Sequence, residues 1–418
     1  MNSFTNWAGN ITFTPRRFHQ PSSVDELRGL VAAAAHIRTL GSGHSFNRIA
    51  DCPDDLVSVA GLPKAISLDA ERATVTVAGG VRFGELTAAL AGSGFALPNL
   101  GSLPHISIAG ACSTGTHGSG DGNGVLATAV SALELVTAEG DLAVIQRGDP
   151  DFPGTVVALG ALGVVTALTL DLVPAFEVAQ YVYEDLPIGQ DAGWLDEVLA
   201  AAYSVSMFTD WQAPRMNQVW LKHRVGDVLA VGAETWRGGT AATGPRNPVP
   251  GMSAENSTEQ LGVPGQWHER LPHFRPDFRP SSGEELQSEY FVPRAHGVAA
   301  VNAMSELGEL FAPVLQIAEI RTIAADGLWL SPCQGRESLA LHFTWVRDTE
   351  AVLPVLAAIE ARLAPFRARP HWGKVFGTTP ETVAGLYEQL PAFQELLRRY
   401  DPAGKFRNEM LDRYVVAN

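Results

Sequence analysis

A histidine stands in an unusually bare stretch near the start of this sequence. The segment "RTLGSGHSFN" (residues 38–47) surrounds His44 with glycines and serines that are too small to shield its ring. Histidines of a packed core are usually walled in by bulky apolar side chains. Because an imidazole can act as a nucleophile, a base or a metal ligand, this loop raises the question of what His44 contacts.

A second glycine-rich loop follows at residues 99–124, "NLGSLPHISIAGACSTGTHGSGDGNG". Glycine lets backbone N–H groups approach a ligand closely, and successive N–H groups can form a nest for an anion such as a pyrophosphate. One such loop alone is more typical of ordinary turns. Two loops, each rich in Ser and Thr and each with a histidine, favour a ligand site.

The spacing in these loops argues against several common motifs. The third glycine of the G-x-G-x-x-G dinucleotide fingerprint is missing after Gly43, and no Gly-Lys-Ser/Thr follows as in a P-loop. His44, His105 and His117 lack the short spacing of metal ligands, and no cysteine or carboxylate joins them in a ligand pattern. We therefore predict no metal site. For His117, capping of a turn stays open as an alternative.

Polar residues two apart mark three apolar segments of the second half. Residues two apart on a strand point to the same face of a sheet. The segments are "LQSEYF", "AEIRT" and "LALHFTWV", and the pairs are Gln287 and Glu289, Glu319 and Arg321, and His342 and Thr344. For any single pair, a solvated face explains the pattern as well as a binding site does. Lys374 in "HWGK" adds a cation, with a surface lysine of buried stem as the alternative.

The composition limits the partners of the chain. It has 418 residues, which suggests two or three domains, and 46% of them are hydrophobic. The 45 acidic residues exceed the 30 basic ones, and the formal net charge is −15. This balance argues against nucleic acid and anionic membranes as partners.

Cysteine usage and the absence of targeting patterns predict a cytoplasmic protein. Cys52, Cys112 and Cys333 form neither a disulfide framework nor a zinc pattern. The opening "MNSFTNWAGN" lacks the features of a signal peptide. The uncharged stretch at residues 153–170 is nearly long enough to span a bilayer. Its three glycines and its proline favour a short helix, a glycine turn and a buried strand instead.

The pattern of elements changes near residue 175. Before it, strands and helices alternate: a helix from residue 24 capped by Ser23, strands at 37–40, 56–62, 73–80 and 163–174, a helix at 81–94 and a hairpin at 132–146. After it, aromatic strand-like segments predict an antiparallel sheet, at 180–187, 203–212, 217–225, 286–293, 315–324 and 339–348. Residues 237–282, rich in Pro, Gly, Ser and Asn, are predicted to form a lid or a crossing segment. A helical pattern returns at 382–411.

The two glycine loops resemble the FAD domain of the vanillyl-alcohol-oxidase superfamily. In many of its members the histidine of the G-x-G-H-S loop bonds covalently to the 8α-methyl group of the flavin, and His44 stands at that position. Such a bond would prevent loss of the cofactor and raise its redox potential. The resemblance implies that the loop is bare because a flavin ring lies against it.

Over nearly the whole chain the resemblance is most specific for the alditol oxidase (xylitol oxidase) family, with the sugar-lactone oxidases as cousins. The matching pieces are "TNWAGN", "LPNLGSLPHIS", "LGALGVVT", "LQSEY", "EIRT", "HFTW", "RPHWGKVF" and "DPAGKF". It implies an α+β fold: an FAD-binding domain at residues 1–175, an antiparallel-sheet substrate (cap) domain at 176–373, and a C-terminal segment at 374–418 that returns to the FAD domain. It also implies a polyol substrate, O2 as its partner and a monomer.

The resemblance assigns residues to both ligands. For FAD these are His44 as the covalent attachment point with Leu40, Gly41, Ser42, Gly43, Ser45, Phe46, Ser102, Ser107, Gly110, Ala111, Cys112, Ser113, Thr114, Gly115, His117, Gly163, Val164 and Val165. For the polyol they are Ser102, Glu319, Arg321, Thr344 and Lys374, with His342 and Gln287 nearby. Gly101, where related flavoproteins commonly have Gly or Ala, favours an oxidase over a dehydrogenase because a small residue eases access of oxygen.

These assignments define an expected mechanism. Arg321 and Lys374 would stabilise negative charge on the C1 oxygen of the polyol, and His342 would accept its proton, with a pKa kept low by neighbouring cations. Glu319 would orient Arg321 and bond the inner hydroxyls. The alternatives are a sugar-1,4-lactone oxidase, a nucleotide- or sugar-binding protein without redox chemistry, and a nicotinamide dehydrogenase, which the broken fingerprint disfavours.

Overall fold

A five-stranded antiparallel sheet forms the centre of one half of the molecule. The computed structural model describes residues 4–189, 192–275 and 284–416. The sheet has the order β10–β9–β11–β7–β6, with β6 at Ile66–Asp69, β7 at Thr74–Ala78, β9 at Val130–Val136, β10 at Leu142–Gln146 and β11 at Val164–Asp171. The predicted hairpin at 132–146 is confirmed by the pairing of β9 with β10.

Smaller elements surround this sheet. A parallel trio joins β3 (Arg17–His19), β5 (Asp55–Val57) and β4 (Ile37–Thr39), and two short pairs join β1 (Phe4–Thr5) to β2 (Thr12–Phe13) and β8 (Phe95–Ala96) to β12 (Val173–Pro174). The helices are α1 (Val24–Ala33), α2 (Phe83–Leu90), α3 (Ile108–Ser113) and α4 (Phe152–Thr155). The Ser23 side chain accepts a hydrogen bond from the Glu26 N–H, so the predicted start of α1 is confirmed.

A ten-stranded antiparallel sheet forms the other half, as the aromatic segments predict. Its order is β16–β17–β13–β15–β14–β20–β21–β19–β22, with β18 paired to β13. The bounds are β13 Glu177–Pro187, β14 Ser204–Thr209, β15 Arg215–Arg224, β16 Thr235–Trp236, β17 Gly239–Ala241, β18 Gly265–Gln266, β19 Glu285–Pro293, β20 Leu315–Ile323, β21 Ser338–Val346 and β22 Arg369–Pro370.

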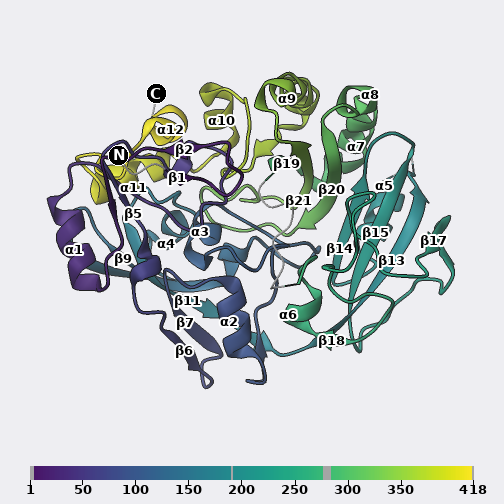
Figure 1. Ribbon diagram of the computed structural model, residues 1–418, viewed down its shortest axis with the longest axis horizontal. Helices are drawn as coiled ribbons and strands as arrows, with labels where there is room; N and C mark the ends of the chain where they lie inside the picture. Colours follow the sequence, from purple (N-terminus) through teal and green to yellow (C-terminus); the bar gives the residue numbers. More distant parts are fainter. Residues whose placement is uncertain (1–3, 190–191, 276–283, 417–418) are drawn as a thin grey trace.

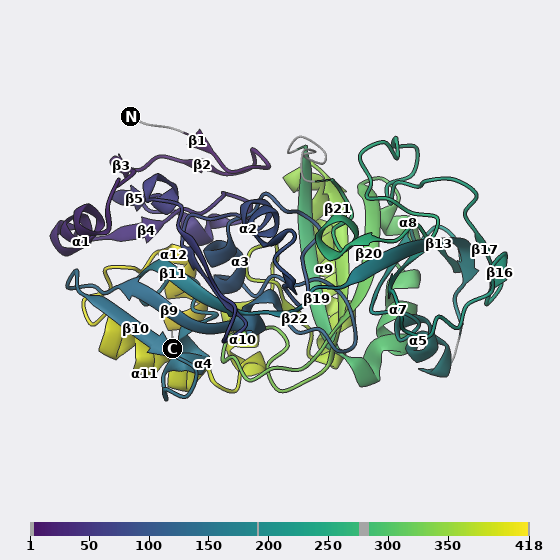
Figure 2. The same ribbon diagram turned by 90° about the horizontal axis from the view of Figure 1, so that it is seen from below.

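Helices cover one face of this sheet, and in Figure 2 the strands β19, β20 and β21 lie between the other half of the molecule and the helices α7 (Gly297–Ser305) and α8 (Gly308–Phe311). The helices α5 (Ala192–Leu199) and α9 (Thr349–Leu363) cover the same face. Leu341, Phe343 and Trp345 of β21 belong to the core that these helices bury. Because side chains alternate along a strand, His342 and Thr344 point to the opposite face.

The C-terminal helices lie in the same half of the molecule as the N-terminal strands (Figure 1). These helices are α10 (Pro380–Leu386), α11 (Leu390–Tyr400) and α12 (Glu409–Leu411). Phe393 and Leu396 of α11 share a core with the five-stranded sheet, and the Ile37 N–H donates to the Lys405 carbonyl at 2.9 Å. The chain therefore returns to the half in which it began. The domain boundaries at residues 175 and 373 stay a prediction.

Two predicted elements are only partly correct. The strand predicted at 56–62 ends at Val57, because the Ser58 side chain caps a 3-10 turn that follows. The helical pattern predicted at 382–411 is interrupted at residues 387–389, between α10 and α11, and breaks again at Asp401. There the Asp401 carboxylate accepts from the Lys405 and Phe406 N–H groups at 2.7 and 2.8 Å, and Gly404 has a φ of +71°. Side-chain capping and a left-handed glycine therefore replace helix up to α12.

The uncharged stretch at residues 153–170 folds as predicted. It contains the end of α4, glycines with positive φ at Gly160 and Gly163, and the buried strand β11. Over the described residues, no helix combines the length and the apolar character that crossing a bilayer requires.

Candidate active site

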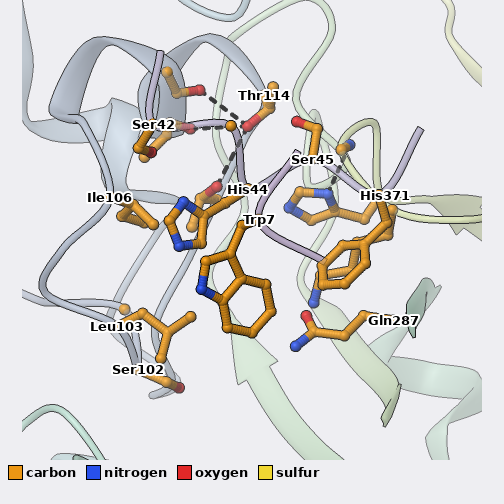
Figure 3. A pocket seen from close by; sticks show the side chains of 18 of the residues that line it. Trp7, Ser42, His44, Ser45, Ser102, Leu103, Ile106, Thr114, Gln287 and His371 are labelled. Atoms are coloured by element: carbon orange, nitrogen blue, oxygen red, sulfur yellow. Dashed lines mark hydrogen bonds between the residues drawn. The ribbon is translucent and has the colours of Figure 1, made fainter. Parts of the chain in front are cut away.

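A cavity of about 500 Å³ lies between the glycine loops and the open face of the ten-stranded sheet. Residues of both loops, of β19, β20 and β21 and of the segment 371–374 line it. Figure 3 shows the near part, where Trp7 and His44 lie on the loop side and Gln287 lies on the sheet side. The two kinds of site that the sequence indicates, an anion-binding loop and a polar sheet face, thus share one space.

The loop side fits a ligand with phosphate oxygens. A Cβ atom at Gly41 or Gly110 would lie 2.7 or 2.8 Å from the Ser107 Oγ and would force this hydroxyl to move, whereas glycine leaves the space open. The Ser107 Oγ is buried and makes no hydrogen bond within the described residues. A buried hydroxyl without a partner is costly, so this atom is well placed to bond a ligand oxygen.

His44 lies against aromatic rings at the edge of the cavity. Its ring stacks on Trp7 with a centroid distance of 5.2 Å and an interplanar angle of 22°, and His105 lies 4.7 Å away. The Trp7 N–H donates to the Gly43 carbonyl at 2.8 Å, which fixes the N-terminal segment to the loop. Gly43 has a φ of +71°, which glycine adopts without strain. This geometry holds the imidazole at a defined place beside the cavity.

Hydrogen bonds join the His44 loop to the distant "HWGK" segment. The Phe46 N–H donates to the Gly373 carbonyl at 2.8 Å, and the Asn47 side-chain amide donates to the carbonyls of Trp372 and Lys374, each at 2.8 Å. Segments that are far apart in the sequence therefore place His44 and Lys374 on the same cavity.

The predicted polar pairs do share one sheet face. The strand register places Glu319 of β20 opposite His342 of β21, which in turn lies opposite Glu289 of β19. In the next pair on the same face, Thr344 of β21 lies opposite Gln287 of β19. These side chains line the cavity. The alternative that each polar pair simply lies on a solvent-exposed face of the sheet is therefore excluded.

Glu289 is the centre of the charge cluster on this face. Its side chain is only 1% exposed. One oxygen accepts from the Arg321 guanidinium at 2.7 Å and lies 3.1 Å from the His117 Nε2, while the other accepts from the Lys374 ammonium at 2.7 Å. Burial opposes ionisation of Glu289, yet Lys374, His117 and Arg321 hold its pKa well below the usual range. The carboxylate is therefore charged and fixes both cations.

His342 is neutral in this environment. Burial, then the positive charges of Lys374 and Arg321, lower its pKa well below the usual value. Burial is thus the largest cause, ahead of the cations that the sequence analysis considered. The His342 Nε2 lies 3.2 Å from the Gln287 Oε1. Because an amide oxygen only accepts, Nε2 carries the hydrogen, and Nδ1 keeps a lone pair that can accept a proton.

Most of the predicted site residues line the cavity. They are Leu40, Gly41, Ser42, Gly43, His44, Ser45, Phe46, Gly101, Ser102, Ser107, Gly110, Ala111, Ser113, Thr114, His117, Gly163, Val165, Gln287, Glu319, Arg321, His342, Thr344 and Lys374. A methyl group at Gly101 would meet its nearest neighbour, the His117 carbonyl oxygen, at 3.6 Å, an ordinary contact distance.

Three residues predicted to bind FAD do not line the cavity. Val164 alternates with Val165 on β11, so its side chain is buried on the opposite face. Cys112 points from α3 into the core. Gly115 turns with a φ of +70° against Pro332. The three cysteines of the chain are buried and free, and the described residues hold no cluster of three or more His, Cys, Asp or Glu arranged for a metal ion.

Other cavity residues were missed. The pairing of Glu289 with Gln287 predicted the correct face, but Glu289 was not among the predicted site residues. Trp7, His273 and His371 also line the cavity. Trp7 and His371 could have been found from the sequence, because Trp7 lies in the matching piece "TNWAGN" and His371 lies in "RPHWGKVF". His273 comes from the segment predicted to form a lid or a crossing segment. Other residues of that segment that line the cavity are Asn247, Pro248, Val249, Met252, Ser253, Asn256 and Phe274, and its residues 276–282 lie outside the described residues.

A buried lysine lies on the same face of the sheet as Glu319. Lys222 of β15 is 1% exposed, and its ammonium donates to the Leu271 carbonyl and to the His273 Nδ1, the latter at 2.9 Å. Burial lowers its pKa to about 7, against which the charge of Glu319 acts to raise it. The folded protein therefore binds the Lys222 proton less tightly than the unfolded chain does.

This pKa predicts a pH-dependent difference between the wild type and Lys222→Met. Below pH 7 the folded and the unfolded protein both hold the Lys222 proton, so the full free-energy cost of burying the charged ammonium remains. Between about pH 7 and 10.5 the folded protein releases it first, so the wild type gains stability by up to about 1.4 kcal/mol per pH unit. The variant lacks this gain. Thermal unfolding of both proteins at pH 7 and 9.5 measures it, and parallel curves would contradict a depressed pKa.

Comparisons with known proteins agree with this site. The FAD binding domain family matches residues 15–146, and the D-arabinono-1,4-lactone oxidase family matches residues 284–414. Among solved structures, cholesterol oxidase from Brevibacterium sterolicum has a TM-score of 0.78 at 17% identity, covering 99% of this chain and 96% of that one. Fold and site thus define an FAD-dependent oxidoreductase of the vanillyl-alcohol-oxidase type.

The sequence relatives narrow this class. An alditol oxidase from Streptomyces sp. is 52% identical over 97% of this chain and 97% of its own length. An L-gulono-1,4-lactone dehydrogenase from Mycobacterium tuberculosis is 28% identical over 99% of both chains. The chain belongs to the alditol oxidase family.

Proposed function

We propose that this protein oxidises the terminal primary alcohol of alditols such as xylitol and sorbitol to the aldose, with O2 reduced to hydrogen peroxide. The observation that carries this proposal is the polar sheet face in the cavity. It combines two carboxylates, Glu289 and Glu319, with two cations, Arg321 and Lys374. A balanced set of donors and acceptors suits a neutral substrate with a hydroxyl on every carbon.

The residues of the chain would prepare the alcohol for oxidation. When bound, FAD would accept the hydride of the C1 carbon, and O2 would then take up that electron pair and the released protons as hydrogen peroxide. Lys374 has two N–H groups beyond the one that donates to Glu289. With Arg321, it would stabilise negative charge on the C1 oxygen. The His342 Nδ1 would accept the hydroxyl proton.

Inner hydroxyls of the alditol would bond the outer part of the same face. Glu319 lies beside Arg321, whose Nε is 3.5 Å from the Glu319 Oε2 and makes no hydrogen bond within the described residues. Ser102 on the loop side and Thr344 on β21 add hydroxyl groups that can donate or accept. The chain would thus hold the alditol between the loops and the sheet.

FAD would be held by the glycine loops, with His44 as the covalent attachment point. The open space at Gly41 and Gly110 and the unbonded Ser107 Oγ support the fit of its phosphates. His44 supports the covalent link because its ring lines the cavity beside Trp7. We further propose that the protein acts in the cytoplasm as a monomer on small molecules.

His44→Ala is expected to abolish covalent flavin attachment. After precipitation in acid, the wild-type pellet should keep the yellow flavin, and the variant should release it to the supernatant. His105→Ala is the matched control, because His105 lies 4.7 Å from His44 but is not at the attachment position. Flavin that stays with the acid-denatured His44 variant would place the link elsewhere. Flavin absorbance of both fractions measures the result.

The substrate is tested by peroxide production in air. Purified protein is given xylitol, sorbitol, glycerol and L-gulono-1,4-lactone separately. Peroxide from the open-chain polyols with little from the lactone supports the proposal. Peroxide from the lactone alone would move the protein to the second candidate, a sugar-1,4-lactone oxidase, which the match of residues 284–414 to the D-arabinono-1,4-lactone oxidase family keeps in view.

A further inference from the structure

His273 connects the crossing segment to the substrate face of the sheet. Its Nε2 lies 2.8 Å from the Glu319 Oε1, and its Nδ1 accepts from the Lys222 ammonium at 2.9 Å. All three side chains are almost fully buried. The backbone position of His273 is fixed separately, because its carbonyl accepts from the Thr258 N–H at 3.0 Å.

Lys222 determines which nitrogen of His273 carries the hydrogen. Burial, then the charge of Lys222, lower the pKa of His273 to about 4, so its imidazole is neutral at working pH. The charged form of Lys222 can only donate, so Nδ1 must then accept and Nε2 must carry the hydrogen. Nε2–H then donates to the Glu319 carboxylate. With the other tautomer, a lone pair would face a carboxylate oxygen.

Aromatic rings fix the plane of the His273 ring. Phe208 and Trp220 contact it edge-on at centroid distances of 5.5 and 5.4 Å. Phe208 also lies opposite Glu319 in the strand register. The orientation of the Nε2–H bond is therefore set by packing as well as by Lys222. One oxygen of Glu319 is held in this way, and the other oxygen remains on the side of Arg321.

We infer that Lys222 and His273 are positioning residues that hold Glu319 in the orientation in which it recognises the inner hydroxyls of an alditol. The inference rests on the proposed function. A carboxylate fixed by one hydrogen bond loses less freedom when it binds a hydroxyl than a carboxylate that must first be ordered. Lys222 and His273 would therefore favour long polyols over alcohols that lack inner hydroxyls.

The test compares xylitol with 1,3-propanediol, which has terminal hydroxyls only. In His273→Phe and in Lys222→Met, kcat/KM for xylitol is expected to fall about 10- to 100-fold, mainly through KM. For 1,3-propanediol it is expected to change by less than about 3-fold. Phenylalanine keeps the aromatic packing and removes both hydrogen bonds. His273→Gln is the conservative variant, since its amide oxygen can accept from Lys222 while its N–H donates to Glu319, and it should stay within about 3-fold of the wild type.

The outcomes separate this inference from the proposed function. An equal loss for both alcohols, or no loss for xylitol, would overturn the positioning role. If His273→Phe does not fold, the contrast between Lys222→Met and His273→Gln decides the question in the same way. A wild type that makes no peroxide from any alditol overturns the proposed function and this inference with it. An active wild type whose variants keep the preference for xylitol overturns this inference alone.

Discussion

Alanine in place of His342 is expected to slow the oxidation of xylitol by about 10²- to 10³-fold while its affinity changes by less than about 3-fold. His342 is neutral because burial and the nearby cations lower its pKa well below the usual range, and Gln287 holds its Nε2. The lone pair of Nδ1 can therefore take the hydroxyl proton as the C1 carbon is oxidised. Removing the acceptor affects the reaction more than the binding, because a proton moves only on the way to the transition state.

Rapid mixing without oxygen separates the two quantities. The loss of flavin absorbance gives the rate of substrate oxidation, and its dependence on xylitol concentration gives the affinity. Thr344→Val is the matched control, since it lies two residues along β21 on the same face and loses only a hydroxyl. It should weaken affinity more than it slows the reaction. An unchanged rate in His342→Ala would remove this residue from the mechanism.

The substrate face could be predicted because it depends on local periodicity. Alternation along "LALHFTWV" separates His342 and Thr344 from Phe343 and Trp345, and the structure confirms that the apolar set packs on helices. The hairpin at 132–146 and the start of α1 follow from turn and capping residues for the same reason. Each of these signals is contained in a few neighbouring residues.

The remaining parts of the site depend on contacts between distant segments. Nothing near Lys222 or His273 in the sequence indicates that they meet, because one lies on β15 and the other on an irregular segment. Val164 does not line the cavity although Val165 does, because alternation on β11 allows only one of the two side chains to face it. Glu289 was not selected because its function comes from Arg321 and Lys374, which other segments supply.

Glu289→Gln is expected to lower the pH at which activity is lost on the alkaline side by about one unit or more. Burial lowers the pKa of Lys374, and the charge of Glu289 acts against that shift. Without the carboxylate, the pKa of Lys374 falls further, so the ammonium loses its proton at a lower pH. Only the charged form stabilises negative charge on the C1 oxygen, and kcat/KM should fall with it.

The same substitution should destabilise the fold by about 2–4 kcal/mol, because an amide cannot balance the buried charges of Arg321 and Lys374. Glu285→Gln is the control: Glu285 lies on the same strand and the same cavity, and its partner is the Gln287 side chain. The profile of kcat/KM for xylitol from pH 6 to 10, with thermal unfolding of each variant, measures both effects. If Glu289 holds the proton on Lys374, the alkaline fall of kcat/KM should move to lower pH in Glu289→Gln and stay at the wild-type pH in Glu285→Gln. If this fall stays at the wild-type pH in Glu289→Gln but moves to higher pH in Lys374→Arg, Lys374 titrates independently of Glu289.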